Sequence, residues 1–196
     1  MNRAGLLMSI AETGYNVGFG AKKNFATHDI VQKMPGFIGF VSLAVGVYGL
    51  VWEQLNSKQI AATLLVLGVM SLYITHYDHN KSEYGDEGQR LTALFYRLRD
   101  LYRDVEAKSD SEDLKDQHDR LEVIQTEFFA ASQTKQILFS DWYAHYKFFW
   151  QHQIEWIDDQ KHFGLFRDKL PLSFMVSAVA AIIAALALAS GVHCAI

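Results

Sequence analysis

The stretch PGFIGFVSLAVGVYGLVWEQL, Pro35 to Leu55, is followed almost at once by IAATLLVLGVMSLYITHY, Ile60 to Tyr77. Charged residues are absent from Pro35 to Trp52 and from Gln59 to Tyr77. One charged side chain at the centre of a membrane helix costs about 2.5 to 3.5 kcal/mol, whereas each Leu, Ile, Phe or Val returns only about 0.3 to 0.6 kcal/mol. The two runs therefore predict a pair of transmembrane helices joined as a hairpin.

A third apolar run closes the sequence, from Pro171 to Ile196, and no charged residue follows Lys169. A helix of about 20 residues crosses a hydrocarbon core of about 30 Å. The third run meets that length, whereas the first two are shorter and need Trp52, Tyr73 and Tyr77 as interfacial anchors. The alternative is that the runs form the buried core of a soluble bundle. We expect an all-α membrane protein with an N-terminal transmembrane hairpin and a C-terminal transmembrane helix.

The composition of the whole chain conceals this pattern. Of 196 residues, 50% are hydrophobic and 20% are charged, which describes an ordinary soluble protein until the charges are located. The net charge of −4 gives no reason to expect a nucleic acid partner. The single cysteine, Cys194, excludes an intrachain disulfide, and Met1 to Ala11 lacks the apolar run of a signal peptide.

The positions of Lys and Arg predict the orientation. Arg3, Lys22, Lys23 and Lys33 precede the first run, and Lys161, Arg167 and Lys169 precede the third. By the positive-inside rule, we expect the N-terminal segment and the central module to lie on the cytoplasmic side of the membrane. The expected divisions are an N-terminal cytoplasmic helix (1–34), the transmembrane hairpin (35–78), a cytoplasmic helical module (79–169) and the C-terminal span (170–196).

Both prolines of the chain mark the same kind of junction. Lys33-Met34-Pro35 and Lys169-Leu170-Pro171 each place a basic anchor and an apolar residue before a proline and an apolar run. Proline is tolerated in the first turn of a helix, where its missing N–H would be unpaired anyway. We therefore expect each proline to open a membrane helix entered from the cytoplasm.

The central module is expected to be a long helical hairpin. Leu91, Leu94, Leu98, Leu101 and Val105 follow a heptad-like seam, with Phe95 and Tyr102 beside it. Ser109 and Glu112 have capping-box spacing, which predicts the start of a second, longer helix. A seven-residue repeat follows, apolar or aromatic except at Lys135: Leu114, Leu121, Phe128, Lys135, Trp142, Phe149, Trp156 and Phe163, joined three residues on by Ile124, Ala131, Leu138, His145 and His152. The pattern predicts a coiled-coil arm.

Aromatic residues are dense in the second half of this module, between Trp142 and Trp156. Some exceed what one seam can bury, so they are candidates for subunit packing or for an interfacial belt. Before the first run, Gly14, Gly18 and Gly20 do not match the phosphate-loop motif, and we expect them to allow close packing against the module instead.

Catalytic and cofactor-binding patterns are not found. His76, Asp78 and His79 lie just past a span, where solvated interface is the simpler interpretation. His145 and His152 fall on the predicted seam, where packed histidines are favoured over a pH switch. No nucleophile motif such as G-x-S-x-G occurs, so we predict no enzyme activity, no cofactor and no metal.

Small residues mark faces of the apolar runs. Such faces let membrane helices pack closely, and two faces exceed what packing within one chain requires, which predicts a homo-oligomer. The candidates for span packing or for lining a pore are Gly39, Ser42, Gly46, Gly49, Ser71, Ser173, Ser177, Ala181 and Ala185.

The stretch YNVGFGAKKNFATHD, Tyr15 to Asp29, followed by a close hairpin of two spans and a long helical part, resembles the SLATT family of SMODS- and SLOG-associating two-transmembrane effector domains. The resemblance implies an effector of bacterial antiphage conflict systems, which permeabilises the inner membrane on a signal of infection and causes growth arrest or abortive infection. The third apolar run departs from the two-span description. No sensor domain is recognised, so the trigger would come from a separate nucleotide-signal or sensor partner, or from a direct effect on the arm.

The expected mechanism transmits a change in arm packing to the spans. The residues predicted to couple the two are Trp142, Phe149, Trp156, Phe163, Lys169 and Pro171. A pore without charged residues in its spans would be poorly selective. The competing hypothesis is a membrane-anchored assembly or sensor protein whose arm binds a partner and whose spans serve only as an anchor.

Overall fold

The computed structural model describes residues 2–130 and 135–193, with side chains described as far as Ala187. This part of the chain is helical and contains no strand, which confirms the all-α prediction. In chain order its elements are α1 (Arg3–Gly49), η1 (Glu53–Leu55), α2 (Lys58–Thr75), η2 (Asp78–Asn80), α3 (Lys81–Glu106), α4 (Lys115–Phe129), α5 (Ser140–Gln151), α6 (Glu155–Lys161), η3 (Leu165–Lys169) and α7 (Leu172–His193).

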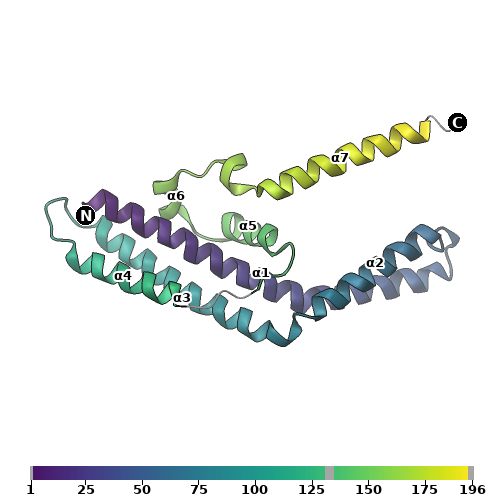
Figure 1. Cartoon of the computed structure of the whole chain (residues 1–196), viewed down its shortest axis with the longest axis horizontal. Coiled ribbons are helices and arrows are strands. Elements are labelled where there is room, and N and C mark those ends of the chain that lie inside the picture. Colours follow the sequence, from purple (N-terminus) through teal and green to yellow (C-terminus); the bar gives the residue numbers. More distant parts are fainter. Residues whose placement is uncertain (1, 131–134, 194–196) are drawn as a thin grey trace.

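The first part of helix α1 packs in a bundle with α3, α4, α5 and α6, and its last part forms an apolar hairpin with α2 (Figure 1). It begins at the N-cap Asn2, whose side-chain oxygen accepts a hydrogen bond from the N–H of Gly5 at 2.9 Å. Its 47 residues include Pro35, so the expectation that Pro35 opens a separate helix is wrong. Proline costs a helix interior about 3 kcal/mol. The helix continues because Val31 and Ile38, on either side of the proline, are buried in one cluster.

The end of α1 and helix α2 form the expected hairpin, with η1 at its turn (Figure 1). The helices that begin at Arg3 and Lys58 each contain an 18-residue window long and apolar enough to cross a membrane. Only 11% of each window is buried. The core helix of a soluble bundle would be mostly buried, so this exposure argues against the soluble alternative.

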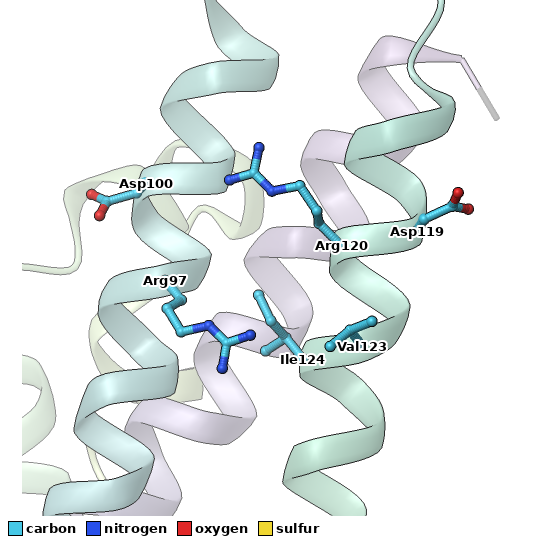
Figure 2. A pocket seen from close by; sticks show the side chains of 6 residues that line it. All are labelled: Arg97, Asp100, Asp119, Arg120, Val123 and Ile124. Carbon is cyan, nitrogen blue, oxygen red and sulfur yellow. The ribbon is translucent and has the colours of Figure 1, made fainter.

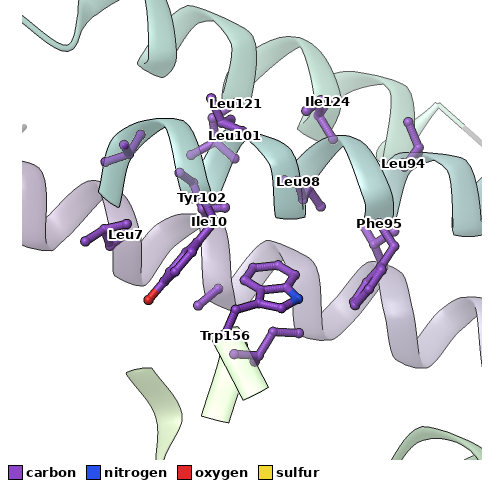
Figure 3. Close-up of a cluster of buried hydrophobic side chains, with 14 of the residues drawn as sticks. Leu7, Ile10, Leu94, Phe95, Leu98, Leu101, Tyr102, Leu121, Ile124 and Trp156 are labelled. Atoms are coloured by element: carbon purple, nitrogen blue, oxygen red, sulfur yellow. The ribbon is translucent and has the colours of Figure 1, made fainter. Parts of the chain in front are cut away.

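The bundle packs α3, α4, α5 and α6 around the first part of α1, and Figure 3 shows its core. The predicted α3 seam is confirmed, since Leu91, Leu94, Leu98, Leu101 and Val105 are at most 3% exposed. Each buried side chain of this size contributes about 1.5–3 kcal/mol of transfer free energy. The seam therefore fixes α3 lengthwise against α1.

The continuous second helix of the predicted coiled-coil arm is not present, because its sequence forms α4, α5 and α6 with breaks between them. Ser109 and Glu112 do make capping-box contacts, with the Ser109 N–H donating to the Glu112 carboxylate at 2.7 Å, but α4 begins only at Lys115. The seam residues Leu114, Leu121, Ile124 and Trp156 are buried. Lys135 and Leu138 are exposed, and Ala131 lies outside the described residues. The breaks let the aromatic side chains of α5 and α6 turn back onto α1.

Helix α7 follows Pro171, as predicted, and the N–H of Met175 donates to the Pro171 carbonyl at 3.1 Å. It leaves the bundle on the same side as the α1–α2 hairpin but stands apart from it (Figure 1). Large apolar side chains around its described part are exposed, among them Leu172, Phe174, Val176, Ile182 and Leu186. The described part of α7 thus has an apolar surface that the other described residues do not cover.

Candidate functional site

The candidate site is the junction where the bundle meets the apolar helices. A second buried cluster lies at the base of the hairpin and consists of Val31, Ile38, Ile74, Tyr77, Tyr84 and Ile137. Ile137 comes from the segment between α4 and α5 and is 3% exposed. The Tyr84 hydroxyl donates a hydrogen bond to the Lys135 carbonyl at 2.6 Å, which holds the same segment. The connection into α5 is therefore fastened to the base of the hairpin.

Buried polar side chains fix this segment against α1. The Thr27 hydroxyl donates to the Gln136 side-chain oxygen at 2.5 Å, and the Gln136 amide donates to Asn24 at 3.3 Å. Thr27 is fully buried and Asn24 nearly so. Buried polar groups are costly unless paired, so this network specifies one register between the segment and α1.

Phe139 directs the chain from this segment into α5. Its φ of 68° lies in the left-handed region, which costs a bulky residue roughly 1–2 kcal/mol. It stands at the N-cap of α5, and its ring lies 4.9 Å from the Trp142 ring. The contacts of the residues around Phe139 compensate for its unfavourable backbone conformation. That conformation sets the direction in which α5 begins.

Trp142 connects α5 to α7. Its indole N–H donates to the Ser173 hydroxyl at 2.9 Å, and its ring meets the Phe174 ring edge-on at 5.4 Å. Ile137 and Trp142 lie close in sequence, and one contacts the base of the hairpin while the other contacts the first turn of α7. The segment 135–142 therefore links the membrane-type helices with the bundle.

Ion pairs between α1 and α5 surround the junction. Asp29 binds the ammonium groups of Lys147 and Lys33, the latter at 2.7 Å, and Lys23 binds Asp141 at 2.8 Å. Partial burial by itself raises the pKa of Asp29, but the hydrogen bonds from Lys147 and Lys33 outweigh it and lower the pKa. Asp29 is thus held in its charged form just before the apolar part of α1.

Behind the junction, α5 and α6 pack onto glycines of α1. A Cβ added at Gly14 would lie 2.2 Å from the Trp156 ring of α6, and one at Gly18 would lie 2.7 Å from Phe95 of α3 and 2.9 Å from Phe148 of α5. The expected close packing of these glycines is confirmed. Of the predicted coupling residues, Trp156 is buried here, and Phe149 and Phe163 pack against the same cluster.

The remaining coupling candidates lie between the bundle and α7. The Lys169 ammonium pairs with Asp158 of α6 at 3.7 Å, and Pro171 precedes α7. Burial lowers the pKa of His145, and burial together with Lys22 and Arg99 lowers the pKa of His152 to about 4. Both histidines are therefore neutral at neutral pH, and they pack among Phe19, Phe95 and Phe148.

The small-residue candidates of the apolar helices differ in their surroundings. No described atom lies within 4 Å of a Cβ built at Gly39 or Gly46, whereas Gly49 faces the backbone of Leu55 at the turn. Ser42 and Ser71 are half-buried, and Ser177, Ala181 and Ala185 are exposed. Of the candidates on α7, Ser173 has a described partner outside the helix, which is Trp142.

A groove between α3 and α4 offers charged groups away from the junction (Figure 2). Arg97 and Arg120 reach into it from the two helices, while Asp100 and Asp119 point outward. Arg97 binds Glu127 at 2.5 and 3.1 Å, and Arg120 binds Asp104 at 3.1 Å. These arginines are already paired, so the groove is an ion-paired seam between the helices.

Sequence reasoning missed Ile137, Gln136 and Phe139 because it placed them inside a continuous helix. One signal was available, since Lys135 occupies a position that a continuous seam would bury. A lysine there indicates that the helix ends before it.

Comparison with known proteins gives one family. The family described as "SMODS and SLOG-associating 2TM effector domain 6" matches residues 1–178, from the start of the chain into α7. No curated protein and no solved structure matches the chain. The match and the exposed apolar helices together indicate a membrane protein. The chain therefore belongs to the SLATT family of two-transmembrane effector domains.

Proposed function

We propose that this protein is a pore-forming or membrane-disrupting effector of a bacterial antiphage system, which permeabilises the inner membrane as a homo-oligomer when triggered. Membership of a family of effector domains supports a role in conflict or defence. The observation that carries the membrane step is the exposed apolar hairpin and α7, both attached to the bundle through the segment 135–142.

The spans favour packing between copies. Gly39 and Gly46 leave an open small face on α1, and α7 carries Ser177, Ala181 and Ala185 on exposed positions. Small residues let membrane helices approach closely. Because the spans hold no charged residue, a path between them would be poorly selective and gated by dewetting.

The bundle is the regulatory part of this proposal. The Lys and Arg distribution supports its location in the cytoplasm. A partner that reports infection, such as the sensor of a nucleotide signal, would act on the bundle and shift the segment 135–142. That shift would move the hairpin base through Ile137 and α7 through Trp142. The protein acts without catalysis, since the proposed mechanism uses only helix packing.

The test is induced expression in bacteria, with and without phage challenge, while a dye reports membrane potential. We expect the intact chain to depolarise the membrane, and a chain ending before Pro171 or carrying Gly46→Leu to fail. Val47→Leu is the matched control, because Val47 is an exposed neighbour outside the small face. If none of these chains changes potential or growth under either condition, the proposal is wrong.

The competing function, a membrane-anchored assembly or sensor protein, predicts a different result. Replacing the apolar helices with unrelated apolar helices of equal length would then leave protection against phage intact. Under the proposed function, the same replacement abolishes depolarisation.

A further inference from the structure

The turn that joins α6 to α7 exposes large apolar side chains. In η3, Leu165 is 48% exposed and Phe166 is 70% exposed, and the side chain of Arg167 beside them is 72% exposed. We call these three residues the exposed turn. The other described residues do not cover it, and two adjacent apolar side chains of this size are unfavourable in water. The exposed turn therefore suits an environment that accepts apolar groups and a cation together.

The backbone around the exposed turn is held in one unusual conformation. His162 has a φ of 50°, in the left-handed region that residues with a Cβ disfavour. Helix η3 is a π-helical turn, in which the Lys169 N–H donates to the Gly164 carbonyl at 3.2 Å, and such turns are rare and frequent at functional sites. The Asp168 carboxylate closes the turn, because it accepts from the Gly164 N–H at 2.9 Å and from Arg167 at 2.8 Å. A fixed structure thus presents the apolar side chains outward.

The position of the exposed turn matches the headgroup layer of a bilayer. Ile137 lies in the cluster at the base of the hairpin, and the Trp142 ring meets the Phe174 ring of α7 at 5.4 Å. The hairpin base and the first turn of α7 are therefore joined by one short segment, and both apolar elements leave the bundle on the same side (Figure 1). Helix η3 ends at Lys169, and α7 begins at Leu172. A bilayer that takes up the hairpin and α7 thus has its headgroup layer at η3.

The chemistry of the exposed turn fits this layer. Apolar and aromatic side chains insert at the boundary between headgroups and acyl chains, while an arginine keeps its charge among the phosphates. Two of the five N–H groups of Arg167 have described acceptors, the Asp168 carboxylate and the His162 carbonyl, and the remainder suit a phosphate oxygen.

A protein partner fits the exposed turn less well. A specific protein interface takes about 20–30 residues from each side, and the turn offers two large side chains on one short element. A bilayer surface needs no complementary shape and is continuous with the environment of the apolar helix that follows.

We propose that the exposed turn inserts into the cytoplasmic headgroup layer of the bilayer and sets the depth at which α7 enters it. Leu165 and Phe166 lie at the boundary with the acyl chains, and Arg167 binds a lipid phosphate. This contact rests on the membrane location and the cytoplasmic bundle of the proposed function, but it does not require a pore.

Spin labelling of the full chain tests the insertion. In a Cys194→Ser background, a nitroxide is attached at Phe166→Cys, at Val123→Cys on α4 or at Leu65→Cys in the hairpin, all exposed positions. The purified chain is placed in vesicles of equal parts phosphatidylethanolamine and phosphatidylglycerol. The ratio of oxygen to nickel-complex collision rates rises with depth in a bilayer. We expect this ratio at Phe166→Cys to be threefold or more that at Val123→Cys, and the ratio at Leu65→Cys to be higher still.

The other outcomes overturn the insertion. Equal ratios at Phe166→Cys and Val123→Cys would place the turn in water. Low collision rates with both reagents at Phe166→Cys would place it in a protein contact, such as one between copies. In either case, a high ratio at Leu65→Cys keeps the membrane location on which the proposed function depends, whereas a low ratio there removes both proposals.

A charge variant tests the effect on α7. Phe166→Glu changes an exposed position, so we expect unchanged circular dichroism, and Val123→Glu is its control. Because a carboxylate is unfavourable at the acyl boundary, α7 should lie shallower in the bilayer. We expect the collision ratio of a nitroxide at Val176 to fall about twofold in Phe166→Glu and to stay constant in Val123→Glu. An unchanged ratio in Phe166→Glu would contradict the assigned control of depth.

Discussion

The two parts of α1 show what one helix does in two environments. Up to Val31, every third or fourth side chain is buried, and Gly14 and Gly18 lie under the rings of Trp156, Phe95 and Phe148. Beyond Pro35 only Ile38 is buried, and Gly39 and Gly46 face open space. Glycine thus packs against aromatic rings of the same chain in the first part of α1. In the second part, Gly39 and Gly46 meet no such neighbour among the described residues.

The difference indicates where each part finds its partner. Glycine in a helix interior costs about 0.5–1 kcal/mol relative to alanine. In the first part, close ring packing offsets this cost, whereas the described chain offers no such contact in the second. The second part therefore leaves an apolar surface open to lipid and, under the proposed function, to other copies.

Overpacking the first part should have the largest effect. Gly14→Leu places side-chain atoms where Trp156 lies, and overpacking costs about 1–3 kcal/mol and occasionally more. We expect a loss of about 3 kcal/mol or failure to fold, measured by thermal unfolding in detergent. Gly39→Leu, with open space at its Cβ, should leave the melting temperature unchanged. Equal losses from both would remove the distinction between the two parts.

The base cluster joins the two parts, since it contains both Val31 and Ile38. Ile137→Ala removes its contribution from the α4–α5 connection, and we expect a loss of about 2 kcal/mol, the lower end for Ile→Ala in a core. Denaturant unfolding measures it, with Leu138→Ala, 63% exposed, as the adjacent control. A larger loss of unfolding free energy from Leu138→Ala than from Ile137→Ala would show that Ile137 is not the residue that fixes the α4–α5 connection to the base cluster.

The first part should also respond to acid through His152, which lies 4.6 Å from Phe95. Burial, Lys22 and Arg99 lower its pKa to about 4, below the unfolded value near 6.5, so the unfolded chain binds the proton more readily. The free energy of unfolding should fall as pH drops from 6.5 to 4, by about 1.5 kcal/mol after allowance for solvent screening.

The measurement is urea unfolding at pH 7 and pH 4.5. His152→Gln, which cannot take up the proton, should lose this part of the pH dependence. A full pH dependence in that variant would assign it to other groups.

The smallest effect is expected at α7. Trp142→Phe keeps a ring beside Phe174 but removes the hydrogen bond to Ser173, which is worth about 0.5–1.5 kcal/mol. A nitroxide at the exposed position Val176 should become more mobile, while Trp150→Phe leaves it unchanged. Unchanged mobility in Trp142→Phe would mean that the indole does not hold α7.

Much of this fold follows from periodicity and charge. The α3 seam was predicted because every member lies on one helix face, and the hairpin because its residues carry no charge. The periodicity of the α3 seam and the absence of charge in the hairpin are both local in sequence. Each can be read because the whole helix lies in one kind of environment.

The junction could not be predicted in the same way. A heptad count runs through Phe139 and Leu138 without interruption, but a left-handed residue and a buried Thr27–Gln136 pair depend on contacts far apart in sequence. Pro35 was placed at a helix start because propensity disfavours it elsewhere, and burial on both sides overrides that preference. The small faces were found from sequence, and the described chain offers no contact to the Cβ positions of Gly39 and Gly46.

The central claim is that the first part of α1 lies in the cytoplasm and the second crosses the membrane. In a Cys194→Ser background, a membrane-impermeant maleimide is applied to spheroplasts carrying Asn56→Cys, at the hairpin turn, or Asp110→Cys, between α3 and α4, both of which are exposed. The account predicts that Asn56→Cys is labelled in intact spheroplasts and Asp110→Cys only after lysis. Labelling of both residues only after lysis, or of both before it, would contradict the account.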